Sequence, residues 1–278
     1  MVTISAFADE ISPELDEQIA VLGEEGIAQL ELRSVWRTNV LDLTDEQLQV
    51  VSGALGKAGI AVSAIGSPIG KVAIDSSFDA HVHRFERAIT VARFLHAPFI
   101  RVFSFYPPEN APAGSDVALF RDEVLHRLRE LTARARAAGV VLLHENEKGI
   151  YGDTIARCVD LCESLADPHF GAIFDPANFI QCGQRPFPEA YEALEPWLRY
   201  VHVKDAIADG TVVPAGAGIG EWPQLLARLQ RAGYEGVLSL EPHLAESARF
   251  GGFSGPERFH EAAVALKNLL HALNWSFA

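Results

Sequence analysis

The amino-acid sequence predicts an α/β protein of the (β/α)8 barrel class, folded as one domain over residues 1–278. Three observations carry this prediction. Short apolar runs alternate with amphipathic helical patterns along the whole chain, and there are eight such runs. The connections after these runs are long, whereas those before them are short. Strict alternation favours parallel strands with right-handed crossovers, and eight strand–helix units close into a barrel.

Local signals mark where the elements begin and end, in chain order. Ser12 before Pro13 predicts a helix start after the first strand, and Thr44 with Gln47 forms a capping box before the second helix. Glycines close several helices just before the next strand, as left-handed terminators do. They are Gly26, Gly59, Gly139 and Gly233. The expected strands are 2–7, 28–33, 60–65, 98–105, 140–146, 170–175, 199–204 and 236–241.

Two helical segments show an apolar stripe at three- and four-residue spacing. One stripe comprises Leu119, Val124, Leu125, Leu128 and Leu131, and the other comprises Trp222, Leu225, Leu226 and Leu229. An open doubly wound sheet is the main alternative for such a chain. It normally has fewer strands and a glycine-rich turn after the first strand, and this sequence shows no such turn. The closed barrel is therefore the favoured architecture.

Composition and charge narrow the choice of partners and location. Of the 278 residues 49% are hydrophobic, and the formal net charge is −14. A surface this acidic repels phosphate backbones and anionic lipids, so we expect neither nucleic acid nor a membrane as a partner. The first residues enter a strand-like segment without a basic leader. Three cysteines are too few for a disulfide framework, which predicts free thiols and a cytoplasmic location.

Four polar side chains stand where the last four predicted strands end. They are Glu145 in VVLLHENE, Asp175 in GAIFDPANF, His202 in YVHVKDA and Glu241 in VLSLEPH. The carboxyl ends of the strands carry the active site of such barrels, so the four should lie on one face. Side chains alternate along a strand, and charged groups cannot face the apolar helix layer without a large cost. The four are therefore assigned to the barrel lumen.

Three carboxylates and one imidazole in one place predict a divalent-metal site, because a cation removes the repulsion among the acids. The set suits Mn²⁺, Mg²⁺ or Co²⁺, whereas a closed zinc site normally shows cysteine or more histidine. Taken singly, His202 could be a satisfied core histidine and Asp175 could cap the following turn. Glu145 and Glu241 are harder to explain that way, since buried glutamates are rare unless paired.

These residues resemble the sugar phosphate isomerase/epimerase family, the xylose-isomerase-like TIM barrels. The resemblance runs from ISAFADEI through HENEKGIYGDT, FDPANF and YVHVKDA to the EPH of the last strand. In that family a Glu–Asp–His–Glu quartet, one residue from each of strands five to eight, holds a divalent metal, commonly manganese. The matching positions are Glu145, Asp175, His202 and Glu241. The resemblance implies Mn²⁺ as the first expectation, with Mg²⁺, Co²⁺ or Zn²⁺ as alternatives.

The chemistry shared by the family implies an isomerase or epimerase of a sugar, keto-polyol or hydroxy-ketone. Glu145 and Glu241 would transfer a proton next to a carbonyl, through a metal-stabilised enediolate. One position departs from the pattern: ketose 3-epimerases commonly carry histidine three residues after the strand-six aspartate, and Asn178 stands here. A metal-dependent lyase, such as inosose dehydratase or a subunit that cleaves 3-oxo-glycosides, is the main alternative. A non-catalytic sugar-binding subunit is the second.

Five further residues are candidate substrate contacts, and four of them have a structural alternative. Lys204 shares the inward face of His202 and could instead form a salt bridge to a ligand carboxylate. Glu147 could sit solvated at the rim, and Arg101 could pair with a neighbouring acid. His243 could be a loop histidine without a role. Asn178 can donate to a substrate hydroxyl but cannot exchange a proton near neutral pH.

Weaker signals concern phosphate and aromatic contacts. GAGIG at 216–220 looks like a phosphate cradle, although a tight entry into the helix near Trp222 explains it as well. FGGFSGPE at 250–257 precedes the last helix, where barrels often grip phosphate. The sequence leaves open whether the carbohydrate or polyol substrate is phosphorylated and whether the protein is a homo-oligomer. Candidate aromatic walls, several of them expected in the core, are Trp36, Phe103, Phe105, Tyr106 and Phe253.

Overall fold

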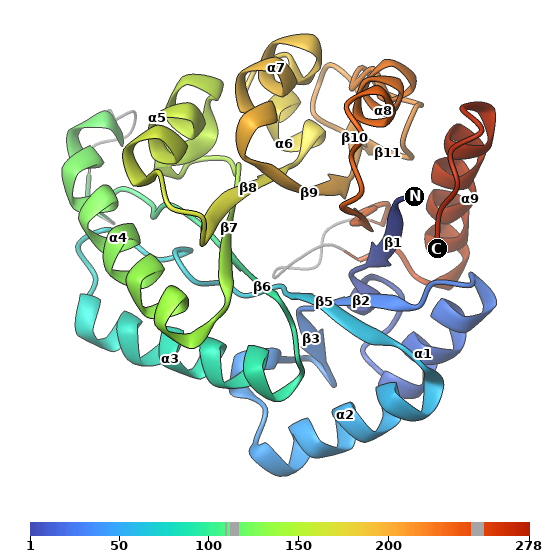
Figure 1. Ribbon diagram of the computed structural model, residues 1–278, viewed down its shortest axis with the longest axis horizontal. Helices are drawn as coiled ribbons and strands as arrows, with labels where there is room; N and C mark the ends of the chain where they lie inside the picture. Colours follow the sequence, from blue (N-terminus) through green and yellow to red (C-terminus); the bar gives the residue numbers. More distant parts are fainter. Residues whose placement is uncertain (109, 112–116, 246–252) are drawn as a thin grey trace.

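Eight parallel strands form a nearly closed barrel surrounded by helices, which confirms the predicted TIM-barrel fold (Figure 1). The computed structural model describes residues 1–108, 110–111, 117–245 and 253–278. Each barrel strand overlaps its predicted range. The strands are β1 (Thr3–Ala6), β2 (Gln29–Leu32), β5 (Ala61–Ile65), β6 (Phe99–Val102), β7 (Val141–Glu145), β8 (Phe170–Phe174), β9 (Leu198–Val203) and β12 (Val237–Leu240).

Helices cover the outside of the barrel and follow the strands in the expected alternation (Figure 1). They are α1 (Leu15–Glu24), α2 (Asp45–Ala58), α3 (Phe78–Phe94), α4 (Arg121–Ala138), α5 (Ile155–Leu165), α6 (Pro176–Gln181), α7 (Tyr191–Leu194), α8 (Trp222–Arg231) and α9 (Pro256–Ala272). Two short hairpins lie at the carboxyl ends of the strands, β3 (Ser34–Val35) with β4 (Thr38–Asn39) and β10 (Asp205–Ala206) with β11 (Val212–Val213). No described helix is long and apolar enough to cross a membrane.

The hydrogen-bonded strand order is β1, β12, β9, β8, β7, β6, β5, β2. Within the described residues this ladder does not join β1 to β2, although the two strands lie side by side (Figure 1). The barrel is therefore closed at this place, called the seam below, by contacts other than a strand ladder.

Apolar side chains separate into an inner and an outer core, as the alternation along the strands predicts. Leu143 and Ile173 belong to a small cluster inside the barrel, together with Ala64 and Tyr200. Val201 and Val203 belong instead to the large core between the strands and the helices. Because His202 lies between these two valines, its side chain is directed inward.

Helix ends follow the sequence signals with two exceptions. The capping box of Thr44 and Gln47 is present, and the four predicted glycines have positive φ. Leu119 is 78% exposed, because it belongs to a 3-10 turn that precedes the first residue of α4. Including it in the apolar stripe was wrong. Ser12 does not cap α1, whose N-cap is Glu14; the Ser12 hydroxyl accepts a hydrogen bond from the Glu14 N–H before the helix begins.

Strand β6 ends at Val102, three residues before the predicted end. Beyond it the backbone pairs with the loop after β5 instead: the N–H of Phe103 donates to Ile69 and that of Phe105 to Gly70. Gly70 has φ +88°, and a Cβ there would collide with the Phe103 carbonyl. Glycine is therefore required at this crossing. The predicted loops 106–115 and 244–256 and the segment 250–257 fall partly outside the described residues.

Candidate metal centre and active site

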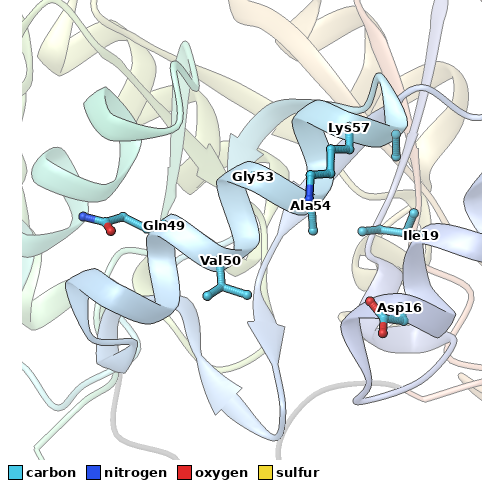
Figure 2. Close-up of a pocket in the computed structure, with 8 residues that line it drawn as sticks. Asp16, Ile19, Gln49, Val50, Gly53, Ala54 and Lys57 are labelled. Atoms are coloured by element: carbon cyan, nitrogen blue, oxygen red, sulfur yellow. The ribbon is translucent and has the colours of Figure 1, made fainter.

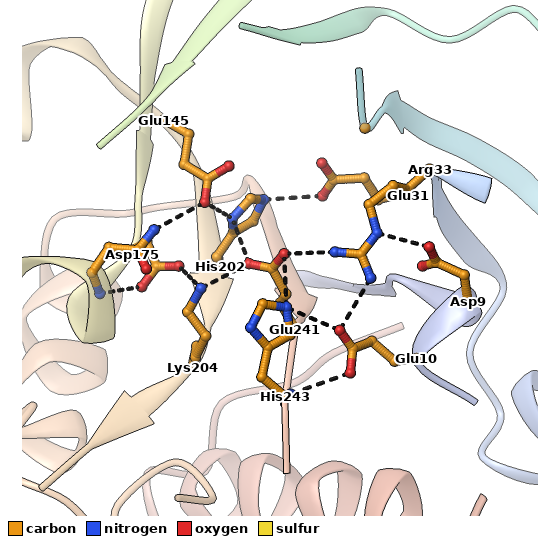
Figure 3. A network of polar contacts seen from close by, with 12 residues as sticks. Asp9, Glu10, Glu31, Arg33, Glu145, Asp175, His202, Lys204, Glu241 and His243 are labelled. Atoms are coloured by element: carbon orange, nitrogen blue, oxygen red, sulfur yellow. Dashed lines mark hydrogen bonds and ion pairs between the residues drawn. The ribbon is translucent and has the colours of Figure 1, made fainter. Parts of the chain in front are cut away.

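The four residues predicted as metal ligands converge at the carboxyl ends of the strands (Figure 3). Glu145 is the last residue of β7, and His202 lies within β9. Asp175 and Glu241 directly follow β8 and β12. One ligand atom of each lies within 4.8 Å of those of the other three, and all four side chains are buried. A buried cluster of this composition could hold a metal ion.

His202 is held from several sides. Its Nε2 lies 3.2 Å from Glu31 Oε2, and its Nδ1 lies 3.2 Å from Glu145 Oε1 and 3.4 Å from Glu241 Oε2. The ring of Phe7 meets the imidazole edge to face, with the ring centroids 5.2 Å apart. An imidazole fixed through one nitrogen presents the other as a ligand, and here Nδ1 faces the carboxylates.

Asp175 serves both the local fold and the cluster. Its Oδ1 accepts a hydrogen bond from the Asn178 N–H at 2.9 Å and so caps α6. The Asn146 side chain bonds the Asp175 backbone in both directions, each time at 2.9 Å. Asp175 Oδ2 lies 2.6 Å from Lys204 Nζ. For Asp175 the sequence predicts either a cap of the following turn or a ligand in the cluster. The structure shows both in this one residue, because its two carboxylate oxygens have different partners.

Basic side chains surround the acids of the cluster. Arg101 Nη1 lies 3.0 Å from Glu145 Oε2 and 3.7 Å from Glu241 Oε1. Lys204 Nζ lies 3.1 Å from Glu241 Oε2, and Arg33 Nη1 lies 3.0 Å from Glu241 Oε1. Burying several carboxylates together is tolerable only when such partners compensate the loss of solvation. These distances show that the salt bridges given as structural alternatives for Lys204 and Arg101 are present.

Neighbouring charges keep both glutamates of the cluster ionised. Burial alone would raise the pKa of Glu145, but His202 and Arg101 lower it to about 2. Burial also acts to raise the pKa of Glu241, and Lys204 with other basic groups brings it well below its usual value. Both groups therefore carry a negative charge at neutral pH.

The pKa values of Asp175 and His202 both lie above their usual range, for different reasons. Burial raises the pKa of Asp175 to about 6, in spite of the adjacent Lys204. Burial acts to lower the pKa of His202, but the carboxylates of Glu145 and Glu31 raise it well above its usual value. In the absence of a metal both nitrogens of His202 therefore carry a proton at neutral pH.

Two further predicted substrate contacts adjoin the cluster. The Asn178 amide donates a hydrogen bond to Glu145 Oε1 at 3.2 Å. His243 Nε2 lies 3.0 Å from Glu10 Oε1 and 3.4 Å from Glu241 Oε1. The His243 side chain is 26% exposed, so it reaches from the cluster toward the opening of the barrel.

Glu147 and most of the aromatic candidates lie farther from the cluster. Glu147 forms a partly exposed ion pair with Lys71, whose Nζ lies 2.8 Å from Glu147 Oε2. Phe103 and Phe105 are fully buried and belong to the core. The remaining candidates are Trp36, which packs on the outer core, Tyr106, which is half-buried, and Phe253, which is exposed.

Four residues at this end of the barrel were not identified from the sequence. Arg33 Nε lies 2.7 Å from Asp9 Oδ2 and its Nη2 lies 3.1 Å from Glu10 Oε1, while Glu31 contacts the imidazole of His202 (Figure 3). A signal for two of them exists in QLELR, where Glu31 and Arg33 alternate with two leucines. That alternation marks lumen-facing positions of a strand.

The GAGIG stretch at 216–220 binds an anion that belongs to the chain itself. Backbone N–H groups of its three glycines donate to the Asp205 carboxylate at 2.9–3.0 Å, and the N–H of Ala206 does so at 2.8 Å. Asp205 is fully buried. A Cβ at Gly220 would lie 2.7 Å from Asp205 Oδ1, so this loop requires glycine. The cradle is thus filled by a carboxylate, and α8 begins at Trp222 as expected.

A separate cavity of about 710 Å³ lies on the outer surface between α1 and α2 (Figure 2). Its lining is mostly small or apolar, with Asp16 and Lys57 as the charged residues. None of the cluster residues is among the residues described as lining it. The barrel end therefore remains the candidate site.

The donor atoms of the cluster fit a divalent cation. Asp175 Oδ2 and His202 Nδ1 are buried and have only ion-pair contacts with described residues, the first with Lys204 and the second with Glu145 and Glu241. Three carboxylate oxygens and one imidazole nitrogen suit Mn²⁺, Mg²⁺ or Co²⁺, which prefer oxygen-rich sets with positions left for water or substrate. The residues present and the chemistry of such an ion therefore agree.

Fold and site together define a barrel of a known family. The chain belongs to the xylose isomerase-like TIM barrel family, whose model matches residues 19–269. No match to its sequence is found among curated proteins.

Solved structures of several proteins share this fold. A D-tagatose 3-epimerase-like protein has 17% identity and a TM-score of 0.78, with 98% of each chain covered. A probable 3-DHS dehydratase from Bacillus anthracis, involved in petrobactin synthesis, has 16% identity and a TM-score of 0.75 over 96% of this chain and 99% of the other. A xylose isomerase-like TIM barrel protein from Mycobacterium smegmatis, in complex with magnesium, has 18% identity and a TM-score of 0.69, with 97% of each chain covered. Likeness at such identities shows the fold alone.

Proposed function

We propose that this chain is a divalent-metal-dependent isomerase or epimerase of a sugar, keto-polyol or hydroxy-ketone, acting by proton abstraction next to a carbonyl. The observation that carries the proposal is the buried cluster of Glu145, Asp175, His202 and Glu241, in which two ionised glutamates flank one imidazole. An epimerase-like protein and a dehydratase among the structural neighbours support an enzyme of this general kind.

The four residues would hold the metal, which supplies Lewis-acid stabilisation of the negative charge that develops on a substrate oxygen. We expect Mn²⁺ first, with Mg²⁺, Co²⁺ or Zn²⁺ as alternatives, and the magnesium complex of one neighbour supports an ion of this type. The three carboxylates alone would leave the filled site with a net negative charge of about one, and the side chains of Lys204 and Arg101 that contact them offset that charge.

Glu145 and Glu241 would carry the proton. They come from β7 and β12, which are separated by β8 and β9 in the strand order, and so they border the site from two sides. Their lowered pKa values keep them ready to accept a proton but make each a weak base. A weak base removes a proton from carbon only if the substrate is made more acidic, and stabilisation of the developing charge has that effect.

The neighbouring polar groups would orient the substrate and the two glutamates. Lys204 Nζ places a positive charge between Asp175 and Glu241, and Arg101 does the same between Glu145 and Glu241. Asn178 cannot return the proton, because its amide group does not titrate. The return of the proton therefore falls to one of the glutamates. Glu147, on the rim, would reach only a substrate that extends outward from the cluster.

A metal-dependent lyase or dehydratase is the second candidate, and His243 is the residue that favours it. Expulsion of a hydroxyl or of an alcohol needs a proton donor beside the leaving oxygen. His243 adjoins Glu241 and is partly exposed toward the opening. Burial would lower its pKa, but Glu241 raises it above its usual value, so this imidazole is charged over a wider pH range.

Solvent isotope exchange tests the proposal. Keto-sugars and hydroxy-ketones are incubated with Mn²⁺-loaded protein in D₂O, and product mass is recorded. Isomerisation adds deuterium to an otherwise unchanged mass, whereas a lyase product loses water or an alcohol. Glu145→Gln and Glu241→Gln should each abolish wash-in, because they cannot accept the proton. Glu86→Gln, which alters an outer ion pair with Arg134, is the control that should keep it. Full exchange in both site variants contradicts the assignment, and bound metal without any exchange favours a non-catalytic sugar-binding subunit.

A further inference from the structure

Glu31 is a carboxylate buried at the inner end of the cluster. It lies on β2, is fully buried, and its Oε2 is 3.2 Å from His202 Nε2. In the strand order β2 is not a neighbour of β9, which carries His202, so the contact crosses the lumen (Figure 3). Its other oxygen, Oε1, makes no hydrogen bond with any described residue. The hydrogen bond to this imidazole therefore helps to offset the burial of the carboxylate.

The side to which Glu31 binds decides which nitrogen of His202 is available. A neutral imidazole has one N–H and one lone pair, and the nitrogen that faces an acceptor carries the hydrogen. Glu31 Oε2 lies opposite Nε2 as the acceptor of its hydrogen, so the lone pair is left on Nδ1. That nitrogen lies 3.2 Å from Glu145 Oε1 and 3.4 Å from Glu241 Oε2, on the side of the other ligands.

The rings on either side of His202 leave little freedom for the imidazole to turn. Phe7 and Tyr200 both meet it edge to face, with centroid distances of 5.2 and 5.8 Å. Aromatic contacts restrict the plane of the ring but do not distinguish its two nitrogens. A hydrogen bond to a fixed acceptor does, and Glu31 is the acceptor that the structure places at Nε2.

We propose that Glu31 is a positioning residue for the metal site, which fixes the Nε2–H tautomer and the ring orientation of His202 so that Nδ1 can bind the ion. This inference rests on the proposed function, because it presumes that the cluster binds a divalent metal. It adds a residue from the second strand to a site otherwise built from the last four.

Metal affinity of variants tests the inference independently of turnover. Mn²⁺ binding is measured by electron paramagnetic resonance of the free ion, for the full chain and for Glu31→Gln and Glu31→Ala. Loss of such an outer partner weakens metal binding about 10- to 100-fold. Ser63→Ala is the control: Ser63 is also buried inside the barrel, where its hydroxyl bonds those of Ser5 and Tyr200. It should leave the affinity for Mn²⁺ unchanged.

A double-mutant comparison separates positioning from a general effect on stability. If Glu31 acts through the imidazole, Glu31→Ala, which removes the acceptor, should weaken Mn²⁺ binding in the natural chain but not when His202→Ala is already present. Equal losses in both backgrounds overturn the inference. A second measurement needs no variant: the ¹⁵N signals of His202 in the Mg²⁺-loaded protein should report the Nε2–H tautomer, and the Nδ1–H tautomer would overturn the proposal.

The two proposals fail in different ways. If the natural chain binds neither Mn²⁺ nor Mg²⁺, the proposed function and the role of Glu31 are both wrong. If the natural chain binds Mn²⁺ and Glu31→Gln and Glu31→Ala bind it equally tightly, only the role of Glu31 is wrong.

Discussion

At the scale of single residues, the backbone at the mouth of the barrel depends on a histidine that must stay neutral. His81 in α3 accepts a hydrogen bond at Nε2 from the Gly70 N–H at 3.1 Å. Burial, with Arg127 nearby, lowers the pKa of His81 to about 4. Protonation would remove the lone pair that Gly70 uses, in the loop that fixes the chain beyond β6.

The pH dependence of stability should report this histidine. Its folded pKa is depressed, so between about pH 6.5 and pH 4 the unfolded chain binds more protons, and stability falls as the pH is lowered. For His81 alone we expect a loss of about 2 kcal/mol between pH 7.5 and pH 5. Urea unfolding at both pH values checks this: the loss should shrink by that amount in His81→Gln. His83→Gln, on the exposed side of the same helix, should keep the full loss.

The sequence identified some residues of the site and missed others for a physical reason. Glu145, Asp175, His202 and Glu241 could be found because each stands at the end of a long apolar run, where a charge has no local explanation. Arg33 does not follow a long apolar run; its one signal is its alternation with Leu30 and Leu32 in QLELR, and an arginine at the end of a strand usually extends into solvent. Its burial follows from Asp9 and Glu10, more than twenty residues earlier in the chain, and such a meeting depends on how the barrel closes.

At the scale of elements, the connection from β9 to α8 is organised around one buried carboxylate. Asp205 begins the hairpin of β10 and β11, and the glycine loop that follows folds back so that its N–H groups surround the same side chain. This places the start of α8 close to the end of β9. Asp205 is next to Lys204, so the loop also fixes the strand end from which Lys204 enters the cluster.

Replacing Asp205 with asparagine should destabilise the protein. The amide has a single acceptor oxygen and turns an NH₂ group toward backbone N–H donors, so several charge-assisted bonds are lost. We expect about 2–3 kcal/mol, because a hydrogen bond to a charged group contributes about 1.5–3 kcal/mol and a buried donor left unpaired adds to the loss. Urea unfolding measures it. Asp209→Asn, on the exposed turn of the same connection, is the matched control, and an equal effect of both changes would contradict the role given to Asp205.

Long elements could be predicted from the sequence better than short ones. Eight strands and the helices between them follow from repeated apolar patterns, because burial of a continuous face needs such a pattern. The hairpins at 34–39 and 205–213 consist of two-residue strands, too short to show any periodicity. The end of β6 was misplaced because Phe103 and Phe105 continue the apolar pattern, while the backbone there already pairs with another loop.

At the scale of the whole molecule, side chains close the barrel where the strand ladder is interrupted. Arg33, which follows β2, bonds Asp9 and Glu10, which follow β1. The Ser34 hydroxyl donates to the same Asp9 oxygen at 2.6 Å. The third partner of Arg33 is Glu241, at the end of β12. One guanidinium therefore connects both strands of the seam to the candidate metal site.

Removing this guanidinium should lower the stability of the protein. Arg33→Met leaves buried acids without their partner, and breaking a buried ion pair from one side typically destabilises by about 3–5 kcal/mol. For a chain of this size that corresponds to a drop in melting temperature of roughly 6–20 °C. Differential scanning calorimetry checks it. Arg84→Met breaks an exposed pair with Asp42 instead and should change stability by about 1 kcal/mol at most. A melting temperature unchanged in Arg33→Met would show that the seam does not depend on the ion pairs.

Because Arg33 both stabilises the seam and contacts Glu241, it cannot readily be replaced when the protein adapts to a new substrate. Among the described residues the Asn178 side chain makes only amide hydrogen bonds, to Glu145 and to the Asn146 carbonyl, so new specificities would arise there first. A library of variants at the mouth of this barrel should accordingly keep Arg33 unchanged. Most replacements of Arg33 would give unfolded chains, in which no new activity could be detected.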